Sequence, residues 1–142
     1  MNTARTCSRR VEFRDTDAAG IMHFSTYFTY MEEAEHELFR QLGTTVMQKV
    51  DNETTISWPR VAAECQFRGS ARFEDEIEIK VAIRRLGKSS VTFAFEFFVD
   101  EGLIATGTMT TVCCLFAKDQ PPKSIPISEP LREQLSALLV AE

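Results

Sequence analysis

The stretch FSTYFTYMEEAEHELFRQL, residues 24–42, decides the fold because its apolar side chains recur with the period of a helix. They lie mostly three or four positions apart, at Phe24, Tyr27, Phe28, Met31, Ala34, Leu38, Phe39 and Leu42. This spacing predicts an amphipathic helix with one buried face. Most of the other face is charged, with Glu32, Glu33, Glu35, Glu37 and Arg40. Ser25 or Thr26 can cap the start, and Gly43 stands where a left-handed C-terminal cap is expected.

After this helix the apolar period changes to two residues, which is typical of strands with one buried face. Four such runs are predicted, at residues 61–67, 77–83, 91–99 and 103–115. Turn signals that contain glycine separate them, at residues 68–70, 86–88 and 100–102. A short strand is also predicted at residues 9–13. A short C-terminal helix capped by Ser128 carries the stripe Leu131, Leu135, Leu138 and Leu139.

This order of elements predicts an α+β fold. A helix of about 18 residues is roughly 27 Å long, and five strands spaced roughly 4.8 Å apart form a sheet of comparable width. The long helix can therefore cover the concave face of one curved antiparallel five-stranded sheet. We interpret residues 1–142 as one domain. Because one helix covers only one face, we expect an edge or the outer face of the sheet to pair with another copy.

The composition indicates a protein that folds in water. The 142 residues carry a net charge of −5 and are 44% hydrophobic, without the concentrated basic face that nucleic acid requires. No apolar run approaches the roughly 20 residues of a membrane span. The first ten residues lack the apolar segment of a secretion signal, so we expect a cytoplasmic location. The four cysteines, Cys7, Cys65, Cys113 and Cys114, lack zinc spacing and are expected to be reduced.

The loop RDTDAAGIMH, residues 14–23, holds the residues best suited to chemistry. It places two carboxylates, Asp15 and Asp17, just before the start of the predicted helix. A helix N-terminus presents unpaired N–H groups that can polarise a carbonyl oxygen, and a nearby carboxylate can attack that carbonyl or activate water. Gly20 allows a tight turn. The alternative is that both aspartates only cap turns, as aspartate commonly does.

The stretch VEFRDTDAAGIMHF, residues 11–24, continued by Tyr27 and Glu32, resembles the signature of 4-hydroxybenzoyl-CoA thioesterase-like hotdog proteins. That signature has a strand, the pattern D-x-D-x-x-G, a few apolar residues, a tyrosine and an acidic residue in the helix. The resemblance is dense over residues 9–42 and rests on strand order elsewhere. It implies the hotdog fold and an acyl-CoA thioesterase acting on a small acyl or aroyl group. It also implies a homodimer or homotetramer with pockets between subunits.

The resemblance implies a role for each matching residue. Asp17 matches the catalytic aspartate, which acts on the thioester carbonyl as nucleophile or general base. Phe24 matches the position at the helix start whose backbone N–H polarises that carbonyl, and Gly20 matches the loop glycine. Glu32 matches an acidic position that faces the acyl pocket near the subunit interface, although a solvated carboxylate is the alternative. Asp15 is expected to shape the loop.

Further residues are expected to bind the substrate. Tyr27 matches the tyrosine of the signature. Many relatives carry a histidine one residue after His23, so the role of His23 stays open between lining the pocket, carrying a proton and a structural hydrogen bond. Arg84, Arg85 and Lys88 flank a turn and are the expected partners of the coenzyme A phosphates. Coenzyme A enters as part of the substrate, and neither a metal nor another cofactor is expected.

Two other functions compete with hydrolysis. A hotdog hydratase or dehydratase is faintly suggested by the sequence Met22-His23-Phe24, but that branch lacks the D-x-D-x-x-G loop. A non-catalytic protein that binds acyl-CoA or an acyl carrier is the third hypothesis, although Asp17 is present. The sequence contains no G-x-S-x-G nucleophile elbow, so an α/β-hydrolase mechanism is not supported.

Overall fold

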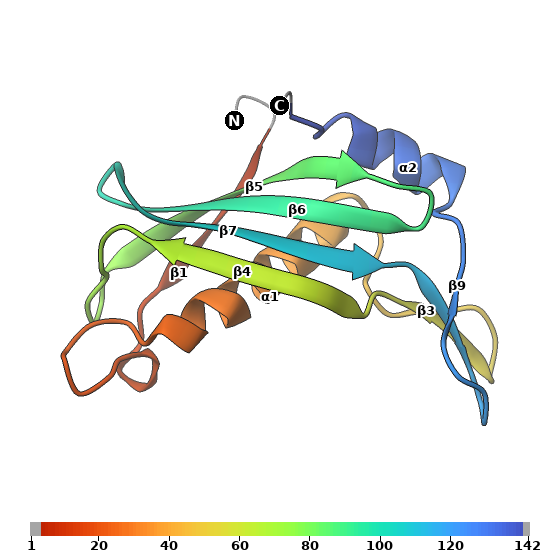
Figure 1. Ribbon diagram of the computed structural model, residues 1–142, viewed down its shortest axis with the longest axis horizontal. Helices are drawn as coiled ribbons and strands as arrows, with labels where there is room; N and C mark the ends of the chain where they lie inside the picture. Colours follow the sequence, from red (N-terminus) through yellow and green to blue (C-terminus); the bar gives the residue numbers. More distant parts are fainter. Residues whose placement is uncertain (1–3, 141–142) are drawn as a thin grey trace.

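The computed structural model describes residues 4–140, and its main feature is a five-stranded antiparallel sheet around a long helix, α1 (Figure 1). The strand order is β1-β5-β6-β7-β4. These strands are β1 (Arg5–Arg10), β4 (Arg60–Phe67), β5 (Glu76–Leu86), β6 (Ser90–Val99) and β7 (Gly102–Val112). Helix α1 spans Phe24–Gln41, and Gly43 has a φ of +82°, as the sequence predicts for the C-terminal cap. The predicted α+β hotdog fold is confirmed.

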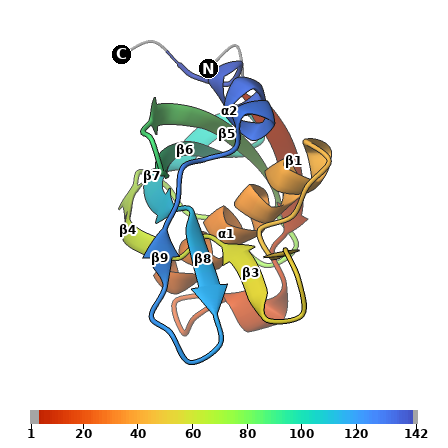
Figure 2. The same ribbon diagram turned by 90° about the vertical axis from the view of Figure 1, so that its right-hand side faces the viewer.

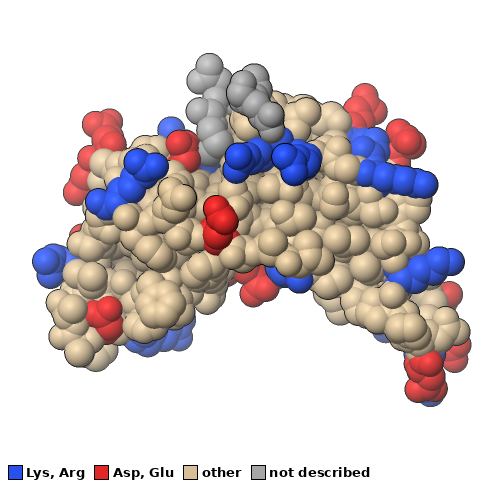
Figure 3. All heavy atoms as spheres, viewed as in Figure 1, with Lys and Arg blue, Asp and Glu red and all other residues tan. Residues whose placement is uncertain are grey.

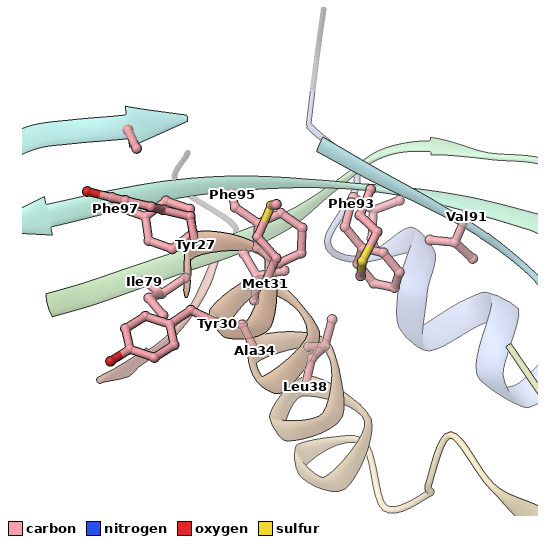
Figure 4. Packing of buried hydrophobic residues seen from close by; sticks show 14 of the residues in the cluster. Tyr27, Tyr30, Met31, Ala34, Leu38, Ile79, Val91, Phe93, Phe95 and Phe97 are labelled. Carbon is pink, nitrogen blue, oxygen red and sulfur yellow. The ribbon is translucent and has the colours of Figure 1, made fainter. Parts of the chain in front are cut away.

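Helix α1 packs on the inner face of the sheet and forms the core with it (Figure 4). Its buried apolar side chains are Tyr27, Tyr30, Met31, Ala34, Leu38 and Phe39. The inward side chains of β5 and β6 include Ile77, Ile79, Val81, Val91, Phe93, Phe95 and Phe97, all buried. Each large apolar side chain that is fully buried contributes roughly 1.5–3 kcal/mol. The alternation in the sequence therefore places the apolar phase of both strands against α1.

The buried face of α1 is rotated relative to the predicted one. Phe24 is 60% exposed and Phe28 is only half-buried, whereas Tyr30 and Glu35 are buried. Phe24 stands at the very start of the helix, beyond the main cluster of core side chains. Phe28 lies on the side of α1 that faces β4, where the sheet ends.

A second sheet closes one end of the molecule (Figure 2). Its strand order is β2-β3-β8-β9, with β2 (Gln48–Lys49), β3 (Thr54–Ser57), β8 (Cys114–Ala117) and β9 (Lys123–Ser124). The predicted strand at residues 103–115 is therefore two strands. Cys113 connects the two sheets, because its N–H donates to Ser89 O at 2.7 Å next to β6, while its carbonyl accepts the Ile125 N–H at 2.9 Å next to β9. The chain then enters the second sheet as β8.

The first strand lies earlier than predicted. It spans Arg5–Arg10 rather than residues 9–13, and residues Phe13–Asp15 form a short 3-10 helix, η1. Glu12 and Asp15 cause this turn through a reciprocal capping box, in which each side chain accepts the other residue's backbone N–H. Phe13 is consequently 77% exposed.

The C-terminal helix α2 spans Glu129–Ser136 and begins after Ser128, as predicted. It is anchored by the buried side chains of Leu135 and Leu138, whereas Leu139 is exposed. The four cysteines are free, as predicted, and burial raises the pKa of the Cys65 and Cys113 thiols to about 11. Within residues 4–140, no helix combines the length and the apolar character needed to span a membrane.

Candidate active site

The loop between β1 and α1 is a tight hairpin that carries Asp17 at its turn. Thr16 and Met22 form an antiparallel bridge at its base. The Asp17 N–H donates to Ile21 O, and the Gly20 N–H donates back to Asp17 O, both at 2.9 Å. Gly20 has a φ of +83°, a conformation that other residues rarely adopt. The glycine of the motif therefore permits the turn that fixes the Asp17 backbone.

The two oxygens of the Asp17 carboxylate differ in their contacts. Oδ1 accepts the Ala19 N–H at 2.9 Å, which is the turn-capping interaction considered from the sequence. Oδ2 takes no hydrogen bond within the part of the chain that the structure describes, and the residue is half-buried. One oxygen therefore shapes the turn, while the other is left for a further contact.

Asp15 anchors this hairpin to the helix, as expected of a residue that shapes the loop. Its Oδ2 accepts the Glu12 N–H at 2.9 Å and the Tyr30 hydroxyl at 3.0 Å. Its carbonyl accepts the His23 N–H at 2.7 Å and the Thr26 hydroxyl at 3.3 Å. These contacts hold the loop that carries Asp17 against the first turn of α1.

The start of α1 carries the backbone N–H of Phe24, to which the family resemblance assigned the polarisation of the carbonyl. Phe24 is the first helical residue, and its N–H has no acceptor among residues 4–140. The N-cap residue is His23, not Ser25 or Thr26 as predicted, because His23 Nδ1 accepts the Ser25 N–H at 3.2 Å. An unpaired donor at the positive end of the helix dipole is suited to bind a carbonyl oxygen or an oxyanion.

A pocket of about 270 Å³ lies between α1 and the edge strand β4. Its lining combines apolar side chains with two charged ones: Phe28, Thr29, Met31, Glu32, Arg60, Ala63 and Met109. Glu32, predicted to face the acyl pocket, therefore lies in the wall of a pocket two helical turns after Phe24. Its carboxylate is 3.3 Å from Arg60 Nη2 and its side chain is 49% exposed.

Arg60, in the wall of this pocket, also forms an ion pair with a buried glutamate that the sequence interpretation missed. Glu35 was assigned to the charged face of the helix, but it is fully buried and bonds Arg60 Nη2 through Oε1. Arg60 also donates to Trp58 O at 2.8 Å and lies 3.4 Å from the ring of His36. Burial raises the pKa of Glu35 to about 7, against the opposing attraction of Arg60.

Tyr27, predicted to bind the substrate, belongs to the core. It is 2% exposed, with its ring centroid 5.0 Å from Phe67 and 5.3 Å from Phe97. Burial raises the pKa of its phenol to about 12, so the hydroxyl keeps its proton. Through its contact with Phe67, Tyr27 packs the first turn of α1 against the end of β4.

The predicted phosphate-binding residues lie on the other face of the sheet. Arg84 and Arg85 are exposed and line a groove of about 750 Å³ together with Glu64 and Glu96. A register shift between Ile83 and Arg85 marks a β-bulge, which explains how two consecutive side chains reach the same groove. Figure 3 shows basic side chains near the upper margin of this face and a wide uncharged area beside them. Lys88 is exposed and does not line the groove.

A long helix held in a curved antiparallel sheet is the arrangement of the hotdog fold. The sequence agrees, because residues 11–135 match the thioesterase-like superfamily, and the chain belongs to that family. It is therefore a thioester hydrolase by class. Among residues 4–140, no group of three or more His, Cys, Asp or Glu side chains is arranged to hold a metal ion.

Three similar proteins carry names that specify a thioester substrate. A solved gentisyl-coenzyme A thioesterase is 32% identical, with a TM-score of 0.80 over 92% of this chain and 99% of that one. A 1,4-dihydroxy-2-naphthoyl-CoA hydrolase of Prochlorococcus marinus (strain MIT 9303) is 31% identical over 103 residues, 68% of each chain. One of the same name from Synechococcus sp. (strain CC9605) is 28% identical over 109 residues, 74% of this chain and 73% of its own.

Proposed function

We propose that the chain hydrolyses a small acyl- or aroyl-CoA thioester at the hairpin that joins β1 to α1. Two groups carry this proposal: an Asp17 carboxylate oxygen and the Phe24 amide at the start of α1, neither of which has a hydrogen-bond partner among residues 4–140. The contacts of Asp15 tie the two groups together. Nucleophilic or general-base attack and oxyanion stabilisation need such a pair.

The chemistry assigns one task to each group. The thioester oxygen accepts the Phe24 N–H, which stabilises the negative charge that develops on it. The Asp17 carboxylate attacks the carbonyl carbon, or it takes a proton from a water molecule that attacks. The carbon–sulfur bond breaks and coenzyme A leaves as a thiolate, which is protonated to the thiol. In the nucleophilic route, water then hydrolyses the acyl-aspartate anhydride, so both routes consume one water and release one carboxylic acid.

The pocket between α1 and β4 favours an aroyl group among the possible substrates. Its apolar side chains can surround a ring, while Glu32 and Arg60 offer partners for a polar substituent. The relatives described above are named for gentisyl-CoA and 1,4-dihydroxy-2-naphthoyl-CoA, whose acyl groups are hydroxylated rings. We extend that substrate class to this chain as a proposal.

The proposal includes a homodimer, with a tetramer as a possible larger assembly. Within the described residues 4–140, strand β4 pairs only with β7, and six of its eight residues are exposed. Arg84 and Arg85 line the face of the sheet opposite α1, whereas the proposed acyl pocket lies on the α1 side. One acyl-CoA molecule could contact both the acyl pocket and these arginines if the pocket came from one copy of the chain and the arginines from a second copy. Lys88 is a further candidate to bind the coenzyme A phosphates.

A panel of acyl-CoA thioesters, assayed by thiol release, tests this function. We expect the wild type to hydrolyse aroyl-CoA and Asp17→Asn to lose at least about 100-fold in kcat. Asp51→Asn is a matched control, because Asp51 Oδ1 accepts the N–H two residues later at 2.8 Å but lies in a distant turn. Full activity of Asp17→Asn would exclude Asp17 from the mechanism.

Two other outcomes would replace the proposed function. Hydration of an enoyl-CoA without thiol release would favour the hydratase. Tight coenzyme A binding with neither reaction would favour a binding protein. Family membership favours hydrolysis over both.

A further inference from the structure

We infer that His23 is a positioning residue whose imidazole caps α1 and thereby holds the Phe24 N–H in place for a thioester oxygen. The inference rests on the proposed function, because that amide needs precise placement only if it activates a carbonyl. Of the three roles that the sequence left open for His23, it favours the structural hydrogen bond over lining the pocket and carrying a proton, and it gives that hydrogen bond a task in the reaction.

The backbone geometry links His23 directly to the Phe24 amide. The N–H of Phe24 belongs to the peptide group between these residues, so the ψ angle of His23 sets the direction in which it points. That angle is 140°, with a φ of −63°. The His23 N–H donates to Asp15 O at 2.7 Å, and its carbonyl accepts the Thr26 N–H at 3.0 Å. Both sides of the residue are therefore anchored.

The side chain of His23 adds a third anchor. Nδ1 accepts the Ser25 N–H at 3.2 Å and lies 2.8 Å from Ser25 Oγ. The ring also stacks on Phe24, with centroids 4.6 Å apart and an interplanar angle of 30°. Because Phe24 is 60% exposed, core packing does little to fix its position. The His23 side chain therefore links His23 to Ser25, and the Phe24 N–H, the candidate oxyanion donor, lies between these two residues.

The same contacts argue against His23 as a general base. The backbone N–H of Ser25 can only donate, so Nδ1 must be the acceptor and the neutral ring carries its proton on Nε2. With Nδ1 engaged and Nε2 protonated, no nitrogen is free to take a proton from water. A capping role predicts that another side chain able to accept the Ser25 N–H can replace the imidazole, whereas a role in proton transfer predicts that it cannot.

Steady-state kinetics on the proposed aroyl-CoA substrate, with the full-length chain, separate these roles. We expect His23→Ala to lower kcat about tenfold with little change in KM, because the displaced amide acts mainly in the transition state. His23→Asn supplies one of the best N-cap side chains and should keep kcat within about threefold of the wild type. Ser128→Ala serves as the matched control, since Ser128 is the N-cap residue of α2 but makes no side-chain cap bond to any described residue.

Two results would overturn the inference: His23→Asn losing as much as His23→Ala, or His23→Ala keeping the wild-type kcat. Amide hydrogen exchange supplies a measurement that does not depend on activity. Exchange at Ser25 should be several-fold faster in His23→Ala than in the wild type or in His23→Asn, and equal rates in all three would contradict the cap. If the wild type hydrolysed no thioester, the proposed function would fail, while the exchange rates would still decide whether His23 caps α1.

Discussion

At the scale of single residues, the most unusual group is the carboxyl of Glu35. It is fully buried, and Oε2 has no hydrogen-bond partner among the described residues. Three neighbours carry or can carry charge: Arg60 on β4, and Glu32 and His36 on α1. Burial raises the pKa of Glu35 to about 7, and Arg60 opposes the shift without cancelling it. The ionised form is therefore destabilised by the fold near neutral pH.

This raised pKa makes a prediction about stability. The folded chain keeps the proton up to about pH 7, whereas the unfolded chain loses it near the ordinary glutamate pKa of 4.5. The folded state thus binds more protons in this window, and the free energy of unfolding falls as the pH rises through it. A shift from 4.5 to about 7 corresponds to roughly 3 kcal/mol. Glu35→Gln should not show this decrease.

Urea denaturation at pH 5 and pH 8 tests the prediction at one fixed protein concentration. The difference in unfolding free energy between Glu35→Gln and the wild type should move in favour of the variant at pH 8. Groups that lie far from Glu35 titrate alike in both proteins and cancel in that difference. Glu37→Gln is a suitable control, because Glu37 lies outside the core on the same helix. A difference that does not change with pH would show that Glu35 stays ionised throughout.

The sequence correctly predicted that Asp15 shapes the loop before α1, but it missed the Glu35–Arg60 ion pair. Glu35 lies four residues after Met31 and three before Leu38, so helical spacing alone placed it on the buried face. Its charge led to the opposite interpretation. Arg60 was harder to predict, because a β-bulge between Arg60 and Ala62 breaks the alternation that would have pointed it outward. Local register changes of this kind depend on the neighbouring strand.

At the scale of elements, the close approach of α1 to the sheet depends on Gly107 in β7. A Cβ atom at this position would lie 2.5 Å from Met31 Sδ and 3.1 Å from Glu64 O. Gly107 pairs with Cys65 on one side and Phe95 on the other, so it sits in the middle of the sheet. The missing side chain leaves the space that the fully buried Met31 fills.

Substituting this glycine should therefore overpack the core. We expect Gly107→Ala to lower the free energy of unfolding by roughly 1–3 kcal/mol, measured by urea denaturation. In a Met31→Ala background the same substitution should cost less, since its main steric partner is gone, and the double-mutant cycle reports the coupling. Equal costs in both backgrounds would show that the Glu64 backbone, rather than Met31, limits the space.

The elements themselves were predictable where one face of an element is buried. Residues 24–42 and the runs at 77–83 and 91–99 showed a clear period, and each became the expected helix or strand. The errors lie where hydrogen bonding rather than burial directs the chain. The capping box of Glu12 and Asp15 ends β1 early, and the hydrogen bonds of Cys113 divide the last predicted strand. Neither set of hydrogen bonds changes the spacing of apolar residues, so neither could be predicted from that spacing.

At the scale of the whole molecule, the free edge of β4 lies in a concave margin. Figure 1 places β4 along the lower side of the sheet, with the hairpin that carries Asp17 near one end and β3 and β9 near the other. The same margin is hollowed in Figure 3. Val61 and Phe67 on this strand are 62% and 48% exposed, which is high for apolar side chains next to a proposed active site. A second copy would cover them and extend the sheet.

Val61→Glu tests whether this edge is the dimer interface. In a monomer the substitution adds a charge to an exposed site and should change stability by less than about 0.5 kcal/mol. In a dimer joined at β4 it buries two unpaired carboxylates, so light scattering should show dissociation at micromolar concentration. Thiol release should fall together with the dimer fraction, because the pocket beside Ala63 opens at the same edge. Val50→Glu is the matched control, since Val50 is 56% exposed but lies between β2 and β3. A wild type that is monomeric and fully active would contradict the proposed dimer, and a Val61→Glu variant that stays dimeric would place the interface elsewhere.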